Sequence, residues 1–160
     1  MIHIRLICVG KLKEKFYIDA VSEYEKRLSA YCRLETVALL EARLPDRPSE
    51  AEVEAALRAE AEGILSKLWK GAAVVALCIE GAEQDSGDVA RLLDKYASSG
   101  VSRLCFVIGG SNGLHASVKA RADIKLSMSR MTFPHHLARV MLLEQLYRGF
   151  KILEGGAYHK

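Results

Sequence analysis

The sequence has few residues of the kinds that break, cross-link or anchor a chain. Only three of its 160 residues are proline and four are cysteine, and no repeat or low-complexity stretch interrupts it. Its apolar runs fall well short of the roughly 18 to 20 residues that cross a bilayer. Arg5 lies inside the first apolar run, and no small-residue cleavage site follows it, which argues against a secretory signal. We expect a single domain over residues 1–160 that works in the cytoplasm and avoids membranes.

The cysteines give no indication of a metal site. Cys8, Cys32, Cys78 and Cys105 form no Cys-x-x-Cys pair, and they join no cysteine and histidine cluster with the spacing of zinc ligands. Most of them lie in apolar runs typical of buried strands, where a free cysteine acts as a small core residue. We therefore expect no bound metal and a reducing compartment.

The net charge is also small. A formal charge of +3 does not by itself indicate nucleic-acid binding, because a strongly basic footprint is the usual electrostatic sign. The positions of the charges are more informative, since the sequence ends in Tyr158, His159 and Lys160. An aromatic ring, an imidazole and a cation suit RNA, which is held by base stacking and phosphate contacts. An ordinary frayed terminus explains the same composition.

What the sequence does contain is a regular alternation of apolar runs and helical spacings. The runs predict strands at residues 2–9, 34–40, 72–79, 103–108 and 124–128. The spacings predict helices at residues 11–29, 50–69, 89–97, 116–122 and 137–153. A capping box formed by Ser49 and Glu52 precedes the second helix. Such alternation, with near-continuous apolar strands, is typical of an α/β fold with a parallel sheet covered on both faces.

Two loops in the C-terminal half follow consecutive strand ends. The first contains Gly109, Gly110 and Gly113, and glycines at such a position let the backbone approach a ligand. The second, residues 129–136, is restricted by Pro134. Ligands of open α/β sheets bind beyond the carboxyl ends of the strands, so we expect both loops to line one pocket. The glycine loop matches neither the dinucleotide nor the phosphate-loop pattern, and a tight turn also explains its glycines.

The last helix carries a charge on its apolar side. Arg139 falls within the stripe formed by Leu142, Leu143, Leu146, Phe150 and Leu153. An arginine there must find a partner, reach past a helix end or lie at an interface. A functional role and a snorkelling core arginine both remain open. On the opposite face, Glu144 and Arg148 form an ordinary i,i+4 pair.

Six segments together resemble the ribosomal large-subunit RNA methyltransferase H family, the minimal members of the SPOUT class. They are Val9–Glu14, Glu23–Leu28, Phe106–His115, Leu126–His135, Arg139–Arg148 and Ala157–Lys160, so the resemblance covers essentially the whole chain. It implies a SPOUT-type parallel sheet flanked by helices, with a deep trefoil knot at the C-terminus. It also implies a homodimer whose cofactor pocket lies beside the subunit interface.

The resemblance further implies a cofactor and a substrate. The cofactor is S-adenosylmethionine, and the substrate is 23S rRNA in the assembled 70S ribosome, methylated at N3 of a pseudouridine. Matching motif positions assign cofactor contacts to Leu77, Gly109, Met128, Ser129, Arg130, Met131, Thr132 and Phe133. Most of these contacts would come from backbone groups and apolar packing, which explains why no charged signature marks the site.

The expected catalytic residues are His135, Arg139, Tyr158 and His159. An imide nitrogen is a poor nucleophile while it is protonated, so the reaction needs a general base or cations that favour the anion. The two histidines have a suitable intrinsic pKa, and Arg139, Arg148 or Lys160 could stabilise the anion. Glu144 is a third candidate base, although its pairing with Arg148 favours a structural role.

Two other classes of function compete with this interpretation. One is a non-catalytic RNA- or ribosome-binding module that uses the basic tail and the Lys11–Lys15 segment. The other is a small flavodoxin-like or nucleotide-binding α/β protein. The dinucleotide version is disfavoured because no acidic residue is placed to bind a ribose after a Gly-x-Gly-x-x-Gly turn.

Overall fold

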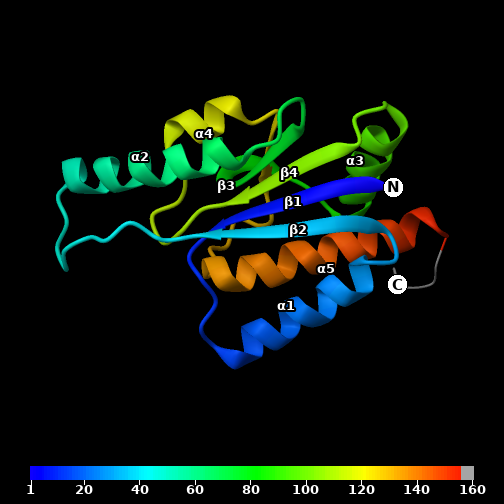
Figure 1. Cartoon of the computed structure of the whole chain (residues 1–160), viewed down its shortest axis with the longest axis horizontal. Coiled ribbons are helices and arrows are strands. Elements are labelled where there is room, and N and C mark those ends of the chain that lie inside the picture. Colours follow the sequence, from blue (N-terminus) through cyan, green and yellow to red (C-terminus); the bar gives the residue numbers. More distant parts are fainter. Residues whose placement is uncertain (156–160) are drawn as a thin grey trace.

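The computed structural model describes residues 1–155, in which five parallel strands form a sheet with the order β2-β1-β4-β3-β5 (Figure 1). The strands are β1 (Ile2–Val9), β2 (Cys32–Leu39), β3 (Ala73–Glu83), β4 (Arg103–Ile108) and β5 (Ile124–Ser127). The helices are α1 (Lys15–Leu28), α2 (Glu50–Lys67), α3 (Ser86–Ser98), α4 (Ala116–Arg121) and α5 (His135–Leu153). The predicted α/β class with a parallel sheet flanked by helices is therefore confirmed.

Helices cover both faces of this sheet. In Figure 1, α1 and α5 lie on one side of the strands, and α2 and α4 lie on the other. One buried cluster joins Ile4 and Leu6 of β1 to Leu143 of α5. A second buried cluster joins Ile7 of β1 to Ile64 of α2. Because the central strands are buried on both faces, their sequences are almost continuously apolar.

Capping residues determine where two of the helices begin. Ser49 accepts a hydrogen bond from the backbone of Glu52, whose side chain accepts one from the backbone of Ser49, so the predicted capping box is confirmed. Asp85 and Asp88 make the same reciprocal contacts at the start of α3. This second box explains why α3 begins before residue 89, where the apolar spacing alone placed its start.

The largest departure from the predicted elements is in β3, which continues beyond residue 79. Its pairing with β5 shifts register between Leu77 and Ala82, so the residues between them bulge out of the ladder. A Cβ atom at Gly81 would lie 2.7 Å from the carbonyl carbon of Leu126, which leaves no space for a side chain. The bulge carries the middle of β3 away from the sheet and toward the loops that follow β4 and β5.

No helix within residues 1–155 has the length and apolar character that a membrane span requires. The same part of the chain contains no cluster of three histidine, cysteine, aspartate or glutamate side chains arranged to hold a metal ion.

Candidate functional site

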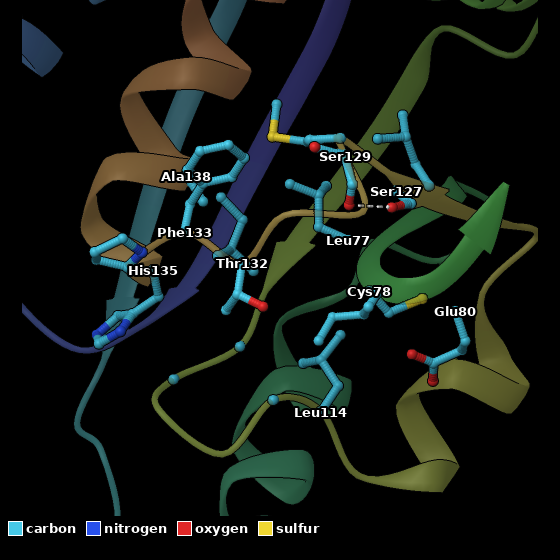
Figure 2. A pocket seen from close by; sticks show the side chains of 18 of the residues that line it. Leu77, Cys78, Glu80, Leu114, Ser127, Ser129, Thr132, Phe133, His135 and Ala138 are labelled. Atoms are coloured by element: carbon cyan, nitrogen blue, oxygen red, sulfur yellow. Dashed lines mark hydrogen bonds between the residues drawn. The ribbon is translucent and has the colours of Figure 1, made fainter. Parts of the chain in front are cut away.

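A cavity of about 810 Å³ opens beyond the carboxyl ends of the central strands (Figure 2). Its walls are the β3 bulge, the glycine loop after β4, and the segment that runs from the end of β5 into α5. In Figure 2, Leu77, Leu114 and Phe133 surround it with apolar side chains. The volume and apolar lining are typical of pockets for small molecules. The prediction that both loops line one pocket is therefore confirmed.

The glycine loop is a tight turn that also forms one wall of the cavity. The Gly113 amide donates to the Gly110 carbonyl at 3.1 Å, and Gly113 has a φ of +79°, which disfavours a side chain. A Cβ at Gly109 would lie 2.4 Å from the Gly113 carbonyl oxygen. The two sequence-based explanations are thus compatible, because the turn that requires glycine also exposes backbone groups to a ligand.

The loop after β5 is folded by its own serine side chains. The buried Ser127 hydroxyl donates to the Ser129 carbonyl at 3.0 Å, the contact drawn as a dashed line in Figure 2. The Ser129 hydroxyl in turn accepts a hydrogen bond from the Met131 amide at 3.0 Å. These bonds tie the loop to itself and to the last residue of β5.

All but one of the residues predicted to contact the cofactor line this cavity. Those that do are Leu77, Gly109, Met128, Ser129, Met131, Thr132 and Phe133. Arg130 is the exception, since its side chain is 92% exposed and lies 3.8 Å from Glu83. The Arg130 side chain is therefore directed away from the wall that its neighbours form.

His135 lies where the cavity meets the end of β1. It lines the cavity, and its ring packs against His136 with centroids 4.1 Å apart. Within residues 1–155, neither Nε2 of His135 nor Nδ1 of His136 has a hydrogen-bond partner. Burial, followed by the nearby His135 and Arg139, lowers the pKa of His136. His136 therefore favours its neutral form at neutral pH, while Nε2 of His135 is a buried nitrogen that faces Gly10 and has no partner among the described residues.

Arg139 is buried beneath the cavity and does not line it. The side chain is part of a residue only 3% exposed, and its Nη2 donates to the Gly10 carbonyl at 2.7 Å. Its Nε has no hydrogen-bond partner within residues 1–155. Burial raises the pKa of the neighbouring Cys8 to about 12, although the Arg139 guanidinium acts in the opposite direction. The sequence required this buried arginine to find a partner, reach past a helix end or lie at an interface. In the structure it has a partner, the backbone carbonyl of Gly10.

Two of the remaining candidates, Glu144 and Arg148, lie on α5. Arg148 and Glu144 form an ion pair at 2.7 Å, with side chains only 25% and 19% exposed, so this face of α5 is more covered than its polar sequence predicted. Tyr158 and His159 lie outside the described residues.

Sequence reasoning missed several residues at the cavity. Cys78 and Glu80 line it because of the β3 bulge, and Glu80 forms an ion pair with Lys119 of α4. Glu41, which follows β2, accepts a hydrogen bond from the amide of Ser111 in the glycine loop. Neither the bulge nor a contact across 70 residues leaves a local sequence pattern, although Gly81 was a visible sign of an irregular strand.

Residues 2–159 match a family model described as predicted SPOUT methyltransferase. Ribosomal RNA large subunit methyltransferase H from Clostridium beijerinckii is 47% identical, and the protein of the same name from Bacillus pumilus is 48% identical, each over 99% of both chains. A putative ribosomal RNA large subunit methyltransferase H from Methanococcus maripaludis is 45% identical over the same share.

Two solved structures share the fold. A probable methylase family protein from Haemophilus influenzae has a TM-score of 0.55 at 15% identity, covering 98% of this chain and 70% of that one. A probable methyltransferase from Bordetella pertussis has a TM-score of 0.55 at 13% identity, covering 91% and 95%. At these identities the similarity concerns the fold alone.

Proposed function

This chain belongs to the SPOUT methyltransferase family, and from that premise we propose that it uses S-adenosylmethionine to methylate large-subunit ribosomal RNA. The proposed acceptor is N3 of a pseudouridine in the 23S rRNA of the assembled 70S ribosome, in the cytoplasm. The observation that carries the proposal is the cavity at the carboxyl edge of the sheet. It is lined by the two loops that the family resemblance assigns to the cofactor.

The residues around the cavity fit S-adenosylmethionine. The apolar side chains of Leu77, Leu114 and Phe133 suit an adenine ring. Gly109 lies so close to Gly113 that position 109 has no space for a side chain, so no side chain at that position covers the backbone of the glycine loop. The backbone of the glycine loop and of residues 128–133 would hold the polar atoms of the cofactor. When bound, the cofactor supplies an electrophilic methyl group on a sulfonium.

The remaining chemistry is the removal of the proton from N3 of the acceptor, and His135 is the residue we propose to receive it. Its Nε2 is buried and without a hydrogen-bond partner among the described residues, and the residue lines the cavity, so a turn of the ring would bring this nitrogen to the acceptor. We propose that Arg139 assists by holding the Gly10 carbonyl in place. Gly10 packs closely against the His135 ring, since a Cβ added at Gly10 would lie 3.1 Å from Nε2 of His135. Tyr158 and His159 complete the proposed catalytic group.

Exposed cations follow β1 and β2, whose carboxyl ends lie at the same edge of the sheet as the cavity. Lys11 and Lys13 follow β1, and Arg43 and Arg47 follow β2, so all four leave the sheet at the edge where the cavity opens (Figure 1). Cations in such a position neutralise phosphates of an RNA backbone. We propose that these four residues, together with the homodimer partner, form the docking surface for the ribosomal RNA.

The catalytic assignment is tested by replacing His135, Arg139, Tyr158 and His159 singly with alanine. Methyl transfer to 70S particles and S-adenosylmethionine affinity are measured separately, the latter by calorimetry. We expect turnover to fall at least about a hundredfold in a general-base variant, with cofactor affinity retained in His135→Ala. His3→Ala, at the opposite edge of the sheet, is the control. Normal turnover in all four variants would overturn the assignment.

The docking surface is tested by the charge reversals Lys11→Glu and Arg43→Glu. Each should weaken binding to ribosomal particles and reduce the slope of log K against log salt by about one, while S-adenosylmethionine affinity stays unchanged. Lys70→Glu is the matched control, since Lys70 is also exposed but lies in the turn before β3, at the other edge. Equal losses in all three variants would contradict a localised surface.

A further inference from the structure

The glycine loop is in contact with a residue from a distant part of the chain. The Ser111 amide donates to Oε1 of Glu41 at 2.8 Å, although the two residues are 70 positions apart. Glu41 belongs to the linker between β2 and α2 and does not itself line the cavity. This contact therefore joins the cofactor loop to an element that the family motifs do not include.

Gly110 makes this approach possible. A Cβ at Gly110 would lie 2.7 Å from Oε1 of Glu41 and 3.1 Å from Cγ1 of Val9. The carboxylate thus occupies the space that any side chain at position 110 would fill. Since Gly110 and Ser111 both line the cavity, the carboxylate supports the loop from behind while the opposite side of the loop faces the ligand space.

The charge of Glu41 suits this role. Burial tends to raise the pKa of Glu41, but the hydrogen bonds from Ser111 and the nearby His135 and His136 together hold that pKa below its usual value. The carboxylate is therefore ionised at neutral pH, and its bond to the Ser111 amide is charge-assisted. Bonds of this kind are stronger than those between neutral groups.

We propose that Glu41 is a positioning residue, which holds the glycine loop in the shape that receives the cofactor. The inference rests on the proposed function, because it takes the glycine loop as part of the S-adenosylmethionine site. Glu41 itself lies behind the loop and acts through Ser111.

The test compares Glu41→Ala and Glu41→Gln with the matched control Glu60→Ala. The Glu60 carboxylate accepts from the amide of Ala42, the next residue of the same linker, at 2.8 Å. If Glu41 positions the loop, Glu41→Ala should weaken S-adenosylmethionine binding in calorimetry about tenfold. Glu41→Gln should stay within about threefold of the wild type, because an amide oxygen still accepts the bond. Glu60→Ala should bind normally.

Amide exchange of Ser111, followed by NMR without the cofactor, separates this inference from the proposed function. The Ser111 amide should be protected in the wild type and in Glu41→Gln, and it should exchange rapidly in Glu41→Ala. Unchanged protection in Glu41→Ala would overturn the contact. Normal cofactor affinity in Glu41→Ala, or an equal loss in Glu60→Ala, would overturn the positioning role. A wild-type chain that fails to bind S-adenosylmethionine would overturn the proposed function, while the exchange result would still decide the contact.

Discussion

Arg139 connects the hydrophobic core to the candidate site. The sequence identifies it as unusual, because a cation within an apolar helical stripe needs a partner. Its partner is the carbonyl of Gly10, 129 positions away. Helical periodicity indicates which face of a helix is buried, but it cannot identify a backbone acceptor on another element. The anomaly was therefore predictable from the sequence, and its solution was not.

Cys78 provides a residue-scale test of where the cofactor binds. It lines the cavity, whereas Cys8, Cys32 and Cys105 are buried in the core. Burial raises the pKa of Cys78, so alkylation should require a more alkaline buffer than a free cysteine does. We expect iodoacetamide to modify Cys78 first, and S-adenosylmethionine at ten times its dissociation constant to slow the reaction about tenfold.

Peptide mass spectrometry over a time course gives the modification rate of each cysteine. Each buried thiol serves as an internal control, because burial raises the pKa of Cys8 and that of Cys32 to about 12. A Cys78 rate that does not change when the cofactor is added would place the cofactor outside this cavity.

Among the elements, the β3 bulge is the wall of the cavity that the sequence did not predict. We expect Gly81→Ala to destabilise the protein by about 3 kcal/mol, because the added methyl group would overlap the backbone of β5. The measurement is the free energy of unfolding in urea, together with cofactor affinity. Gly63→Ala in α2 is the control, since its Cβ would meet Leu39 at an ordinary 3.4 Å. Equal stability of the two variants would contradict the close packing at Gly81.

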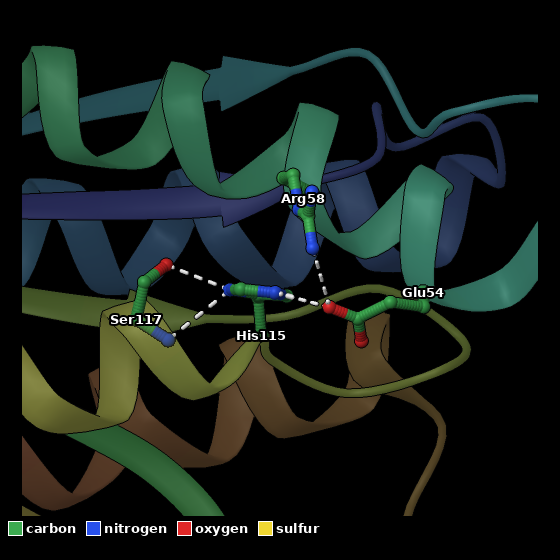
Figure 3. A network of polar contacts seen from close by, with 4 residues as sticks. All are labelled: Glu54, Arg58, His115 and Ser117. Atoms are coloured by element: carbon green, nitrogen blue, oxygen red, sulfur yellow. Dashed lines mark hydrogen bonds and ion pairs between the residues drawn. The ribbon is translucent and has the colours of Figure 1, made fainter. Parts of the chain in front are cut away.

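His115 links α4 to α2 through a small polar network (Figure 3). Its Nδ1 accepts from the Ser117 amide at 3.1 Å, and its Nε2 lies 2.6 Å from Oε1 of Glu54, which also contacts Arg58. One neutral tautomer, with the proton on Nε2, satisfies both contacts of the ring. A structural role for His115, as cap and link, follows from this geometry.

The cap and the link can be separated by substitution. His115→Ala removes both and should lower the free energy of unfolding by about 1 kcal/mol through the cap alone. His115→Asn should recover the cap.

The hydrogen bond from His115 lowers the pKa of Glu54, so the stabilisation from Glu54 is present above its ordinary pKa. It is lost as the pH falls through the lower folded value. The difference between wild type and Glu54→Gln should therefore shrink on acidification in urea titrations, and a constant difference would contradict the link.

The features that the sequence could predict depend on residues close together in the chain, and those that it could not predict depend on contacts between distant elements. The strands and the Ser49 capping box were predictable because apolar periodicity and capping depend on residues close in sequence. The start of α3 was also recoverable, since Asp85 and Asp88 repeat the same spacing. The β3 bulge and the Glu41 contact arise only when distant elements pack together. The cavity loops were located correctly because parallel strands end at one edge of a sheet.

At the scale of the whole molecule, the parallel sheet gathers loops from four strands around one cavity. The loops after β1 and β2 provide cations and Glu41, and those after β4 and β5 provide the walls. The same loops also hold Glu14, Glu41 and Asp46, so this edge is only weakly basic, in line with the net charge of +3. The trefoil knot and the homodimer stay predictions from the family resemblance, and the single domain stays a prediction from length and composition.

The central claim is that this chain methylates large-subunit ribosomal RNA, and it is tested most directly in cells that lack the protein. Their 23S rRNA is digested and compared by mass spectrometry with rRNA from the parent cells. The account predicts the loss of one methyl group, from a pseudouridine, and its return when the wild-type chain is restored. An unchanged pattern of rRNA methylation in cells without the protein would contradict it.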